Sequence, residues 1–126
     1  MRAVDTNVLI RLILHDDSRQ TAVAKSFIEG GVWVSVLALA EATWVLSSVY
    51  EVGSEELAIA IEMLLNHNDL VLQEEEAVAR SLELFRARPA LGFSDCLMIE
   101  LARKAGYLPL GTFDRDLAKV DGAQKL

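Results

Sequence analysis

Short apolar runs alternate with longer helical segments along almost the whole chain, and this alternation limits the fold more than any other feature. The predicted strands comprise residues 2–4, 32–34, 70–72 and 108–112. Strands that alternate with helices favour a parallel sheet with helices on both of its faces. We therefore predict an α/β fold, a three-layer α/β/α sandwich with a central, mainly parallel sheet of four to five strands.

The segments between the strands have helical patterns and clear end signals. Helices are predicted over residues 7–14, 18–29, around Glu41, from Ser54, over 74–88 and 94–104, with a short last helix from Asp114. Ser18, Ser54 and Ser94 are predicted N-caps, because a serine hydroxyl can accept a hydrogen bond from the first helical turn. The tail from Val120 is a candidate edge strand.

Length and composition indicate one domain in a reducing compartment. The 126 residues, 52% of them hydrophobic, are enough for a core, but no apolar run approaches the roughly 18 residues of a membrane span. Asp5 and Arg11 interrupt the N-terminal apolar stretch, which argues against a signal peptide. The lone Cys96 fits a cytoplasmic location, and His15 and His67 lack the spacing of zinc ligands.

Four carboxylates stand in apolar sequence, where an ionised side chain is costly unless it is paired or binds a metal. They are Asp5, Glu41, Asp95 and Asp114. Asp5 and Asp114 each follow a predicted strand, and in parallel sheets the ligand crevice lies outside the carboxyl ends of the strands. Asp95 opens a predicted helix, and Glu41 lies on an apolar helix from which its long side chain can reach the same crevice. The sequence thus predicts one acidic pocket for divalent cations.

Carboxylate oxygens are hard ligands that suit Mg²⁺ or Mn²⁺. In phosphodiester cleavage one such ion generates hydroxide from bound water, and another stabilises the leaving oxygen. A pocket of this kind needs no histidine, cysteine or serine nucleophile. The residues therefore indicate metal-dependent hydrolysis of a phosphate ester.

The net charge of −7 argues at first against a nucleic-acid partner, because phosphates bind Lys and Arg. Four of the nineteen acids belong to the predicted pocket, and two bound divalent cations would bring −7 to −3. Basic residues remain for a local rim: Arg11, Arg86, Arg88, Arg103, Lys104, Arg115 and Lys119. Net charge alone therefore does not exclude a polyanionic substrate.

The ordered set of motifs resembles the PIN-domain nucleases, and most closely the VapC-type toxin ribonucleases of bacterial toxin–antitoxin pairs. The matching segments are residues 4–9, which include Asp5-Thr6-Asn7, and residues 35–46, 93–102 and 112–117. The resemblance implies a single PIN-like nuclease domain over residues 1–126 and Mg²⁺-dependent endoribonuclease activity, with Mn²⁺ as a possible substitute. It further implies an RNA substrate, a protein antitoxin as partner, and a homodimer.

The resemblance also implies roles for individual residues. The residues implied as catalytic metal ligands are Asp5, Glu41, Asp95 and Asp114. Three further residues are implied in support: Asn7, which would orient Asp5, Thr112 as a hydroxyl beside the pocket, and Asp116 as a candidate fifth ligand. The middle of the chain, residues 52–90, carries no family motif.

Each acid also has a simpler explanation when it is taken alone. Asp5 is placed to cap the following helix, and Asp95 and Asp114 are placed like ordinary first-turn acids. Glu41 is a candidate for a buried ion pair with Arg11. Only the four acids together favour a metal site over these structural roles.

Other function classes remain as alternatives. A phospho-accepting, Mg²⁺-binding receiver domain needs adjacent acids after the first strand, but Asp5 is followed by Thr6 and Asn7. A haloacid-type phosphatase needs a second aspartate where Asn7 stands. A PIN-fold binding module without catalytic activity is disfavoured by the complete set of four acids.

Overall fold

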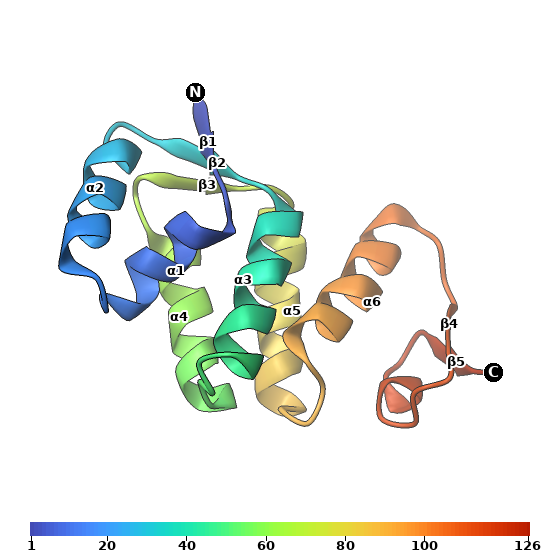
Figure 1. Cartoon of the computed structure of the whole chain (residues 1–126). Helices are drawn as coiled ribbons and strands as arrows, with labels where there is room; N and C mark the ends of the chain where they lie inside the picture. The colour runs from blue at the N-terminus through green and yellow to red at the C-terminus, as the bar shows by residue number, and fades with distance from the viewer.

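A computed structural model describes residues 1–126, in which five short strands alternate with six α-helices (Figure 1). The strands are β1 (Arg2–Val4), β2 (Val32–Val34), β3 (Leu70–Leu72), β4 (Leu110–Thr112) and β5 (Ala123–Lys125). The helices are α1 (Thr6–Leu14), α2 (Ser18–Ile28), α3 (Val36–Ser48), α4 (Ser54–Asn66), α5 (Glu75–Ala87), α6 (Phe93–Ala105) and a 3₁₀ turn, η1 (Leu117–Lys119). The predicted three-layer α/β/α class with parallel strands is confirmed.

The first three strands form one parallel sheet in the order β1-β2-β3. Alternate residues of β2 and β3 fill its buried face: Val32, Val34, Leu70 and Leu72. The opposite face carries Ala3, Trp33 and Val71, which lie in one row across the three strands. Trp33 is 39% and Val71 45% exposed, so the helices cover this second face only in part.

The hydrophobic core extends from the sheet through the helices. It is one connected cluster that includes fully buried residues of α1, α3, α4 and α6. Its largest members with almost no exposure are leucines and isoleucines: Leu9, Ile10, Leu39, Leu46, Ile61, Leu64, Leu97 and Ile99. Because burying one such side chain stabilises a fold by about 1.5–3 kcal/mol, α6 is firmly attached to the helices around it.

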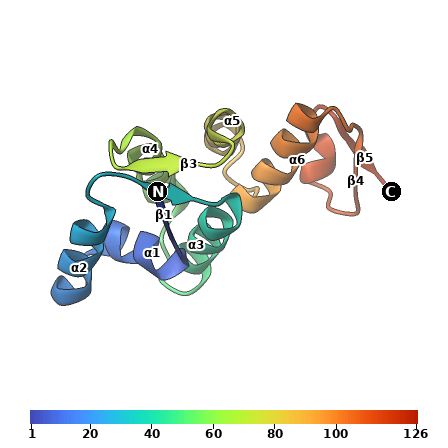
Figure 2. The ribbon, with the colours of Figure 1, turned by 90° about the horizontal axis from the view of Figure 1, so that it is seen from above.

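The last third of the chain extends away from the first sheet. Helix α6 packs against α5 and α3, and the strands β4 and β5 beyond it form a second, separate parallel sheet. This C-terminal arm, residues 93–126, projects to one side in both views, whereas residues 1–88 form the N-terminal body (Figures 1 and 2). Within the arm, Arg103 donates a hydrogen bond of 2.6 Å to the Asp121 carbonyl and connects α6 to the turn before β5.

The prediction of one continuous sheet is wrong for this structure. Five strands are present, but they divide into β1-β2-β3 and β4-β5. The cause is the direction of α6, which leads from its contacts with α5 and α3 away from β1 (Figure 2). Strand β4 therefore begins far from the edge of β1, and that edge stays unpaired.

Most predicted boundaries agree with the structure within two residues, but three predicted serine caps are wrong. The N-caps are Asp17, Gly53 and Gly92, each placed one or two residues before the predicted serine. Asp17 accepts a hydrogen bond of 3.0 Å from Gln20 N–H and takes the role expected of Ser18. The last predicted helix is only the 3₁₀ turn η1, and the candidate edge strand is present as β5.

Candidate functional site

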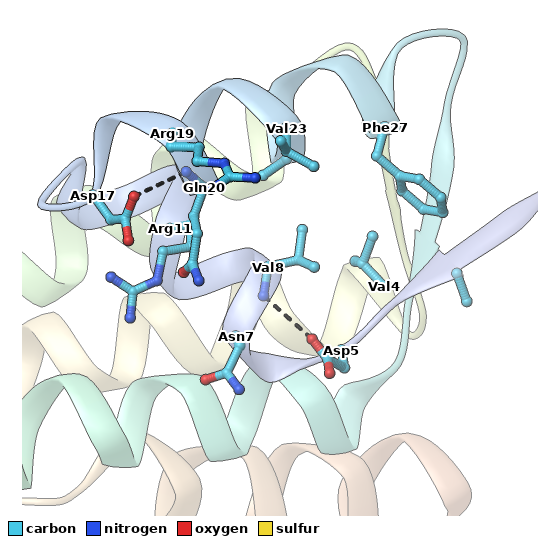
Figure 3. Close-up of a pocket in the computed structure, with 12 residues that line it drawn as sticks. Val4, Asp5, Asn7, Val8, Arg11, Asp17, Arg19, Gln20, Val23 and Phe27 are labelled. Carbon is cyan, nitrogen blue, oxygen red and sulfur yellow. Dashed lines mark hydrogen bonds between the residues drawn. The ribbon is translucent and has the colours of Figure 1, made fainter.

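Asp5 occupies the junction between β1 and α1. It is the N-cap of α1, and its Oδ1 accepts a hydrogen bond of 3.3 Å from Val8 N–H (Figure 3). The side chain is exposed, and its Oδ2 has no partner in the chain. Asp5 therefore caps α1 through Oδ1, and its other carboxylate oxygen remains free for a ligand. Asn7 makes no hydrogen bond to Asp5, which is oriented by the Val8 backbone instead.

Glu41 lies beside Asp5 and is connected to it through the intervening threonine. Thr6 Oγ1 donates a hydrogen bond of 3.1 Å to Glu41 Oε2, so α1 and α3 bring the two acids into one region. Although α3 is an apolar helix, the side chain of Glu41 is exposed, so it cannot form the buried ion pair that the sequence left open. The predicted alternative of an ion pair with Arg11 is wrong, since Arg11 binds Asp16 and Tyr50.

Thr6 is a functional candidate that the sequence reasoning did not single out. Its hydroxyl holds a carboxylate that lies 35 residues away in sequence. The signal was its position between Asp5 and Asn7, in the motif on which the resemblance rests. Without the structure, nothing indicated that it contacts α3.

Asp95 and Asp114 form a second pair of acids, in the C-terminal arm. Asp95 is the third residue of α6 and is half-buried. Burial raises the pKa of Asp95 above its ordinary value, and the negative charge of Asp114 raises it further, while the Gly92 backbone acts in the opposite direction. The two carboxylates are thus close enough to repel each other electrostatically.

Backbone hydrogen bonds hold Asp114 after β4. Its Oδ1 accepts from Asp116 N–H at 2.9 Å and from Leu117 N–H at 2.8 Å, and its own N–H donates to Thr112 Oγ1 at 3.0 Å. Thr112 therefore fixes the backbone of Asp114, in line with its predicted supporting place. The Asp116 carboxylate is exposed and lies 4.0 Å from the Lys119 amine, so it points toward η1.

The four acids thus lie in two pairs, Asp5 with Glu41 in the body and Asp95 with Asp114 in the arm. No group of three or more aspartate, glutamate, histidine or cysteine side chains is close enough to share one metal ion. The predicted convergence of all four in one pocket does not occur within this chain, because β4 does not lie beside β1. The donor set itself, made only of carboxylate oxygens, fits Mg²⁺ or Mn²⁺.

One acid of each pair borders a hollow in the surface, and the two hollows are different. Asp5 lies at a groove of about 700 Å³ between β1, α1 and α2 (Figure 3). One end of this groove is apolar, and its lining includes Val4, Val8, Val23, Ala24 and Phe27. Asp95 instead borders a smaller pocket of about 340 Å³, whose lining includes Trp44 of α3.

Two arginines line the polar end of the groove beside Asp5. They are Arg11 and Arg19, and Figure 3 shows both near Gln20. A hydrogen bond with Tyr50, and then one with Asp16, raise the pKa of Arg11, while its partial burial acts in the opposite direction. The groove therefore combines a fixed cation with the free oxygen of Asp5.

The comparison with protein families identifies the class of this fold and site. The PIN domain family matches residues 2–123, almost the whole chain, and the chain therefore belongs to the PIN-domain family. PIN domains are generally nucleases, which supports a hydrolase that acts on phosphodiester bonds. No curated protein and no solved structure gives a significant match. None of the helices has the length and apolar character needed to cross a membrane.

Proposed function

We propose that this protein is a Mg²⁺-dependent endoribonuclease, with Mn²⁺ as a substitute, which acts as a cytoplasmic toxin and is neutralised by a protein antitoxin. The main support is one observation within a PIN-family chain. Asp5 directly follows the parallel strand β1, Asp114 comes two residues after the end of β4, and each keeps one carboxylate oxygen free of protein partners. Ligand sites in parallel α/β proteins lie at this end of the strands.

The residues that would hold the metal are Asp5, Glu41, Asp95 and Asp114. When bound, Mg²⁺ or Mn²⁺ supplies activation of water and stabilisation of charge on the leaving oxygen. The chain contributes orientation. Backbone N–H groups fix one oxygen of Asp5 and of Asp114, and the Thr6 hydroxyl fixes Oε2 of Glu41. The remaining oxygens are thereby directed outward in a limited set of positions.

Positive side chains near both acid pairs support a polyanionic substrate. Arg11 and Arg19 line the groove at Asp5, and Arg115 directly follows Asp114. Such local cations attract phosphates even when the net charge of the protein is negative. RNA phosphates are the substrate groups that we assign to this groove.

The exposed side of α3 supports the proposed antitoxin contact. Leu37 is 75% and Trp44 62% exposed, and Glu41 lies between them on the same helix. An amphipathic partner segment that covers Leu37 and Trp44 would bring a cationic side chain to Glu41. Expression of the protein without a partner should arrest bacterial growth, and Asp5→Asn should relieve the arrest. Harmless expression of the wild type in several hosts would contradict the toxin role.

The nuclease activity is tested directly by RNA cleavage with and without a chelator. Cleavage of a mixed RNA pool should require Mg²⁺ or Mn²⁺ and stop in excess EDTA. Glu55→Gln, which changes an exposed acid in the first turn of α4, is the matched control and should cleave like the wild type. Cleavage that continues in EDTA would exclude the metal mechanism. RNA binding without cleavage in Mg²⁺ would instead favour a PIN-fold binding module.

A further inference from the structure

Both sheets have unpaired outer edges, and the edges of β1 and β4 belong to the strands that precede Asp5 and Asp114. β1 is hydrogen-bonded only to β2, and β4 only to β5, so one edge of each strand presents unpaired backbone groups. Such edges are templates for pairing with another strand. Apolar surface lies next to both, since Val23 beside the β1 groove is 63% exposed and Leu108 before β4 is 40% exposed.

The four proposed metal ligands are divided between the same two sheets. Asp5 follows β1 in the body, and Asp114 follows β4 in the arm. Pairing β4 in parallel with β1 would place these two strand ends side by side. The resulting strand order, β3-β2-β1-β4-β5, is a common doubly wound order, in which ligands bind where the order reverses, between β1 and β4.

We propose that the partner of the β1 edge is the β4–β5 sheet of a second copy of this chain. Each copy offers one β1 edge and one β4 edge, so two copies can exchange their β4–β5 sheets reciprocally in a closed two-fold dimer, while each α6 stays on its own body. Every acidic site then contains Asp5 and Glu41 of one chain and Asp114 of the other. The pairing of strands stands on the fold alone, whereas the shared site rests on the proposed nuclease function.

The packing of α6 explains why the strand comes from a second copy. Phe93, Cys96 and Leu97 of α6 are buried in contacts that tie the arm to α5 and α3. Residues 106–109 connect α6 to β4, and four residues reach about 14 Å at most. In both views α3, α5 and α6 lie between β1 and β4 (Figures 1 and 2). The chain's own β4 would have to break the α6 contacts to reach β1, whereas a second copy leaves them intact.

Charge distinguishes β4 from β5, and an adjacent groove distinguishes β1 from β3, because Ala3 and Val4 line that groove and no residue of β3 does. β5 ends at Lys125, whose amine donates to the Phe113 carbonyl, and a charged residue protects an edge from pairing. β4 (Leu110-Gly111-Thr112) carries no charge. β1 has the apolar groove beside it, in which Val4 and Val8 remain only half-buried. A strand added at β1 would extend the sheet over this groove.

Cross-linking between two distinguishable chains tests the pairing without any need for activity. Ala3→Cys is placed on a tagged chain and Phe113→Cys on an untagged chain; both positions are exposed, and the native Cys96 is buried. The two chains are refolded together and treated with a short bismaleimide. We expect a product that contains both chains, in particles of twice the 13.9 kDa chain mass. Glu55→Cys in place of Ala3→Cys is the control and should give no such product.

Two results would overturn the proposal. One is the absence of any cross-link between the tagged and untagged chains. The other comes from the double variant Ala3→Cys/Phe113→Cys: a cross-link within a single chain, in particles of monomer mass, means that the arm folds back on its own body.

Complementation tests whether the site is shared. Asp5→Asn and Asp114→Asn homodimers each lack one ligand in both sites. After the two are refolded together, half of the dimers are mixed, and each mixed dimer has one site with all wild-type acids. We therefore expect roughly a quarter of wild-type cleavage from the mixture, against almost none from either variant alone. No recovery, with an active wild type, would exclude a shared site. An inactive wild type with the expected cross-link would reject the nuclease function and leave the strand exchange standing.

Discussion

The body and the arm each hold two of the four proposed metal ligands, but they hold them in different ways. In the body, Asp5 and Glu41 are exposed and are fixed by hydrogen bonds from Val8 and Thr6. In the arm, Asp95 is half-buried and is repelled by Asp114, so its pKa is raised. Hydrogen bonds thus stabilise the charged carboxylates in the body, whereas burial and repulsion destabilise the charged form of Asp95 in the arm. A cation that bound both pairs would relieve this repulsion only in the arm.

The largest expected effect is on catalysis, where both halves should be equally necessary. Asp5→Asn and Asp95→Asn should each lower kcat/KM for RNA cleavage by more than about 100-fold, the upper range for loss of a residue that merely supports a metal ligand. Asp116→Asn should cost less than about tenfold, because that carboxylate points toward Lys119. The measurement is the rate of cleavage of a labelled RNA in Mg²⁺. Equal losses at all three positions would contradict the ranking.

The next effect, on stability without metal, should have opposite signs in the two halves. Asp5→Ala removes the cap of α1 and should cost about 1 kcal/mol, or about 3–5 °C in Tm. Asp95→Asn should raise Tm at pH 7, because it removes a repelled and partly buried charge. Melting curves in EDTA give both values. A lower Tm for Asp95→Asn would mean that Asp95 is mainly a structural acid of α6.

The gain from Asp95→Asn should depend on pH in a defined direction. The folded pKa of Asp95 lies above the ordinary value of 3.8, so folding favours the protonated form. The penalty is absent below pH 3.8, grows as the pH rises through the folded pKa, and is complete at neutral pH. The difference in Tm between Asp95→Asn and wild type should therefore shrink toward zero as the pH falls to 3.8. A difference that stays constant with pH would rule out a charge effect.

Mg²⁺ should reverse the order of the two proteins. At about 100 times its dissociation constant, bound metal stabilises the wild type by about 2.7 kcal/mol. Asp95→Asn should lose most of this gain, since a ligand and part of the attracting charge are gone. The test is a Tm titration with Mg²⁺ for both proteins. An equal response would remove Asp95 from the metal site.

A smaller effect on kcat should come from the Thr6 hydroxyl, which donates a hydrogen bond to Glu41. Thr6→Val removes the hydrogen bond to Glu41 and should lower kcat by about fivefold, since an exposed hydrogen bond contributes about 1 kcal/mol. Thr6→Ser keeps the hydroxyl and should restore kcat, with KM and Tm little changed in both variants. If Thr6→Ser is as impaired as Thr6→Val, the methyl group rather than the hydrogen bond matters.

Much of the body follows from its sequence, because local patterns determine it. The positions of β1, β2 and β3 and the alternative of a cap at Asp5 depend on neighbouring residues, and both agree with the structure. The exposure of Glu41 was missed because α3 is apolar on all sides, so the pattern does not show that Leu37 and Trp44 face outward. The placement of β4 was missed for a different reason. A three-residue strand with a central glycine carries little information about its neighbour, and the direction of α6 decides it.

The unpaired edges also have a consequence for the behaviour of the protein at high concentration. A β4–β5 sheet that pairs with a second chain does not require that chain's β4–β5 sheet to pair back with the first. If the second chain's β4–β5 sheet pairs instead with a third chain, the contact is head-to-tail and does not close, and such contacts grow into filaments. Arg2 is the only charge on β1, and its guanidinium lies over the Phe27 ring, where it does little to block growth. Overproduced protein should therefore form fibres rather than amorphous aggregates.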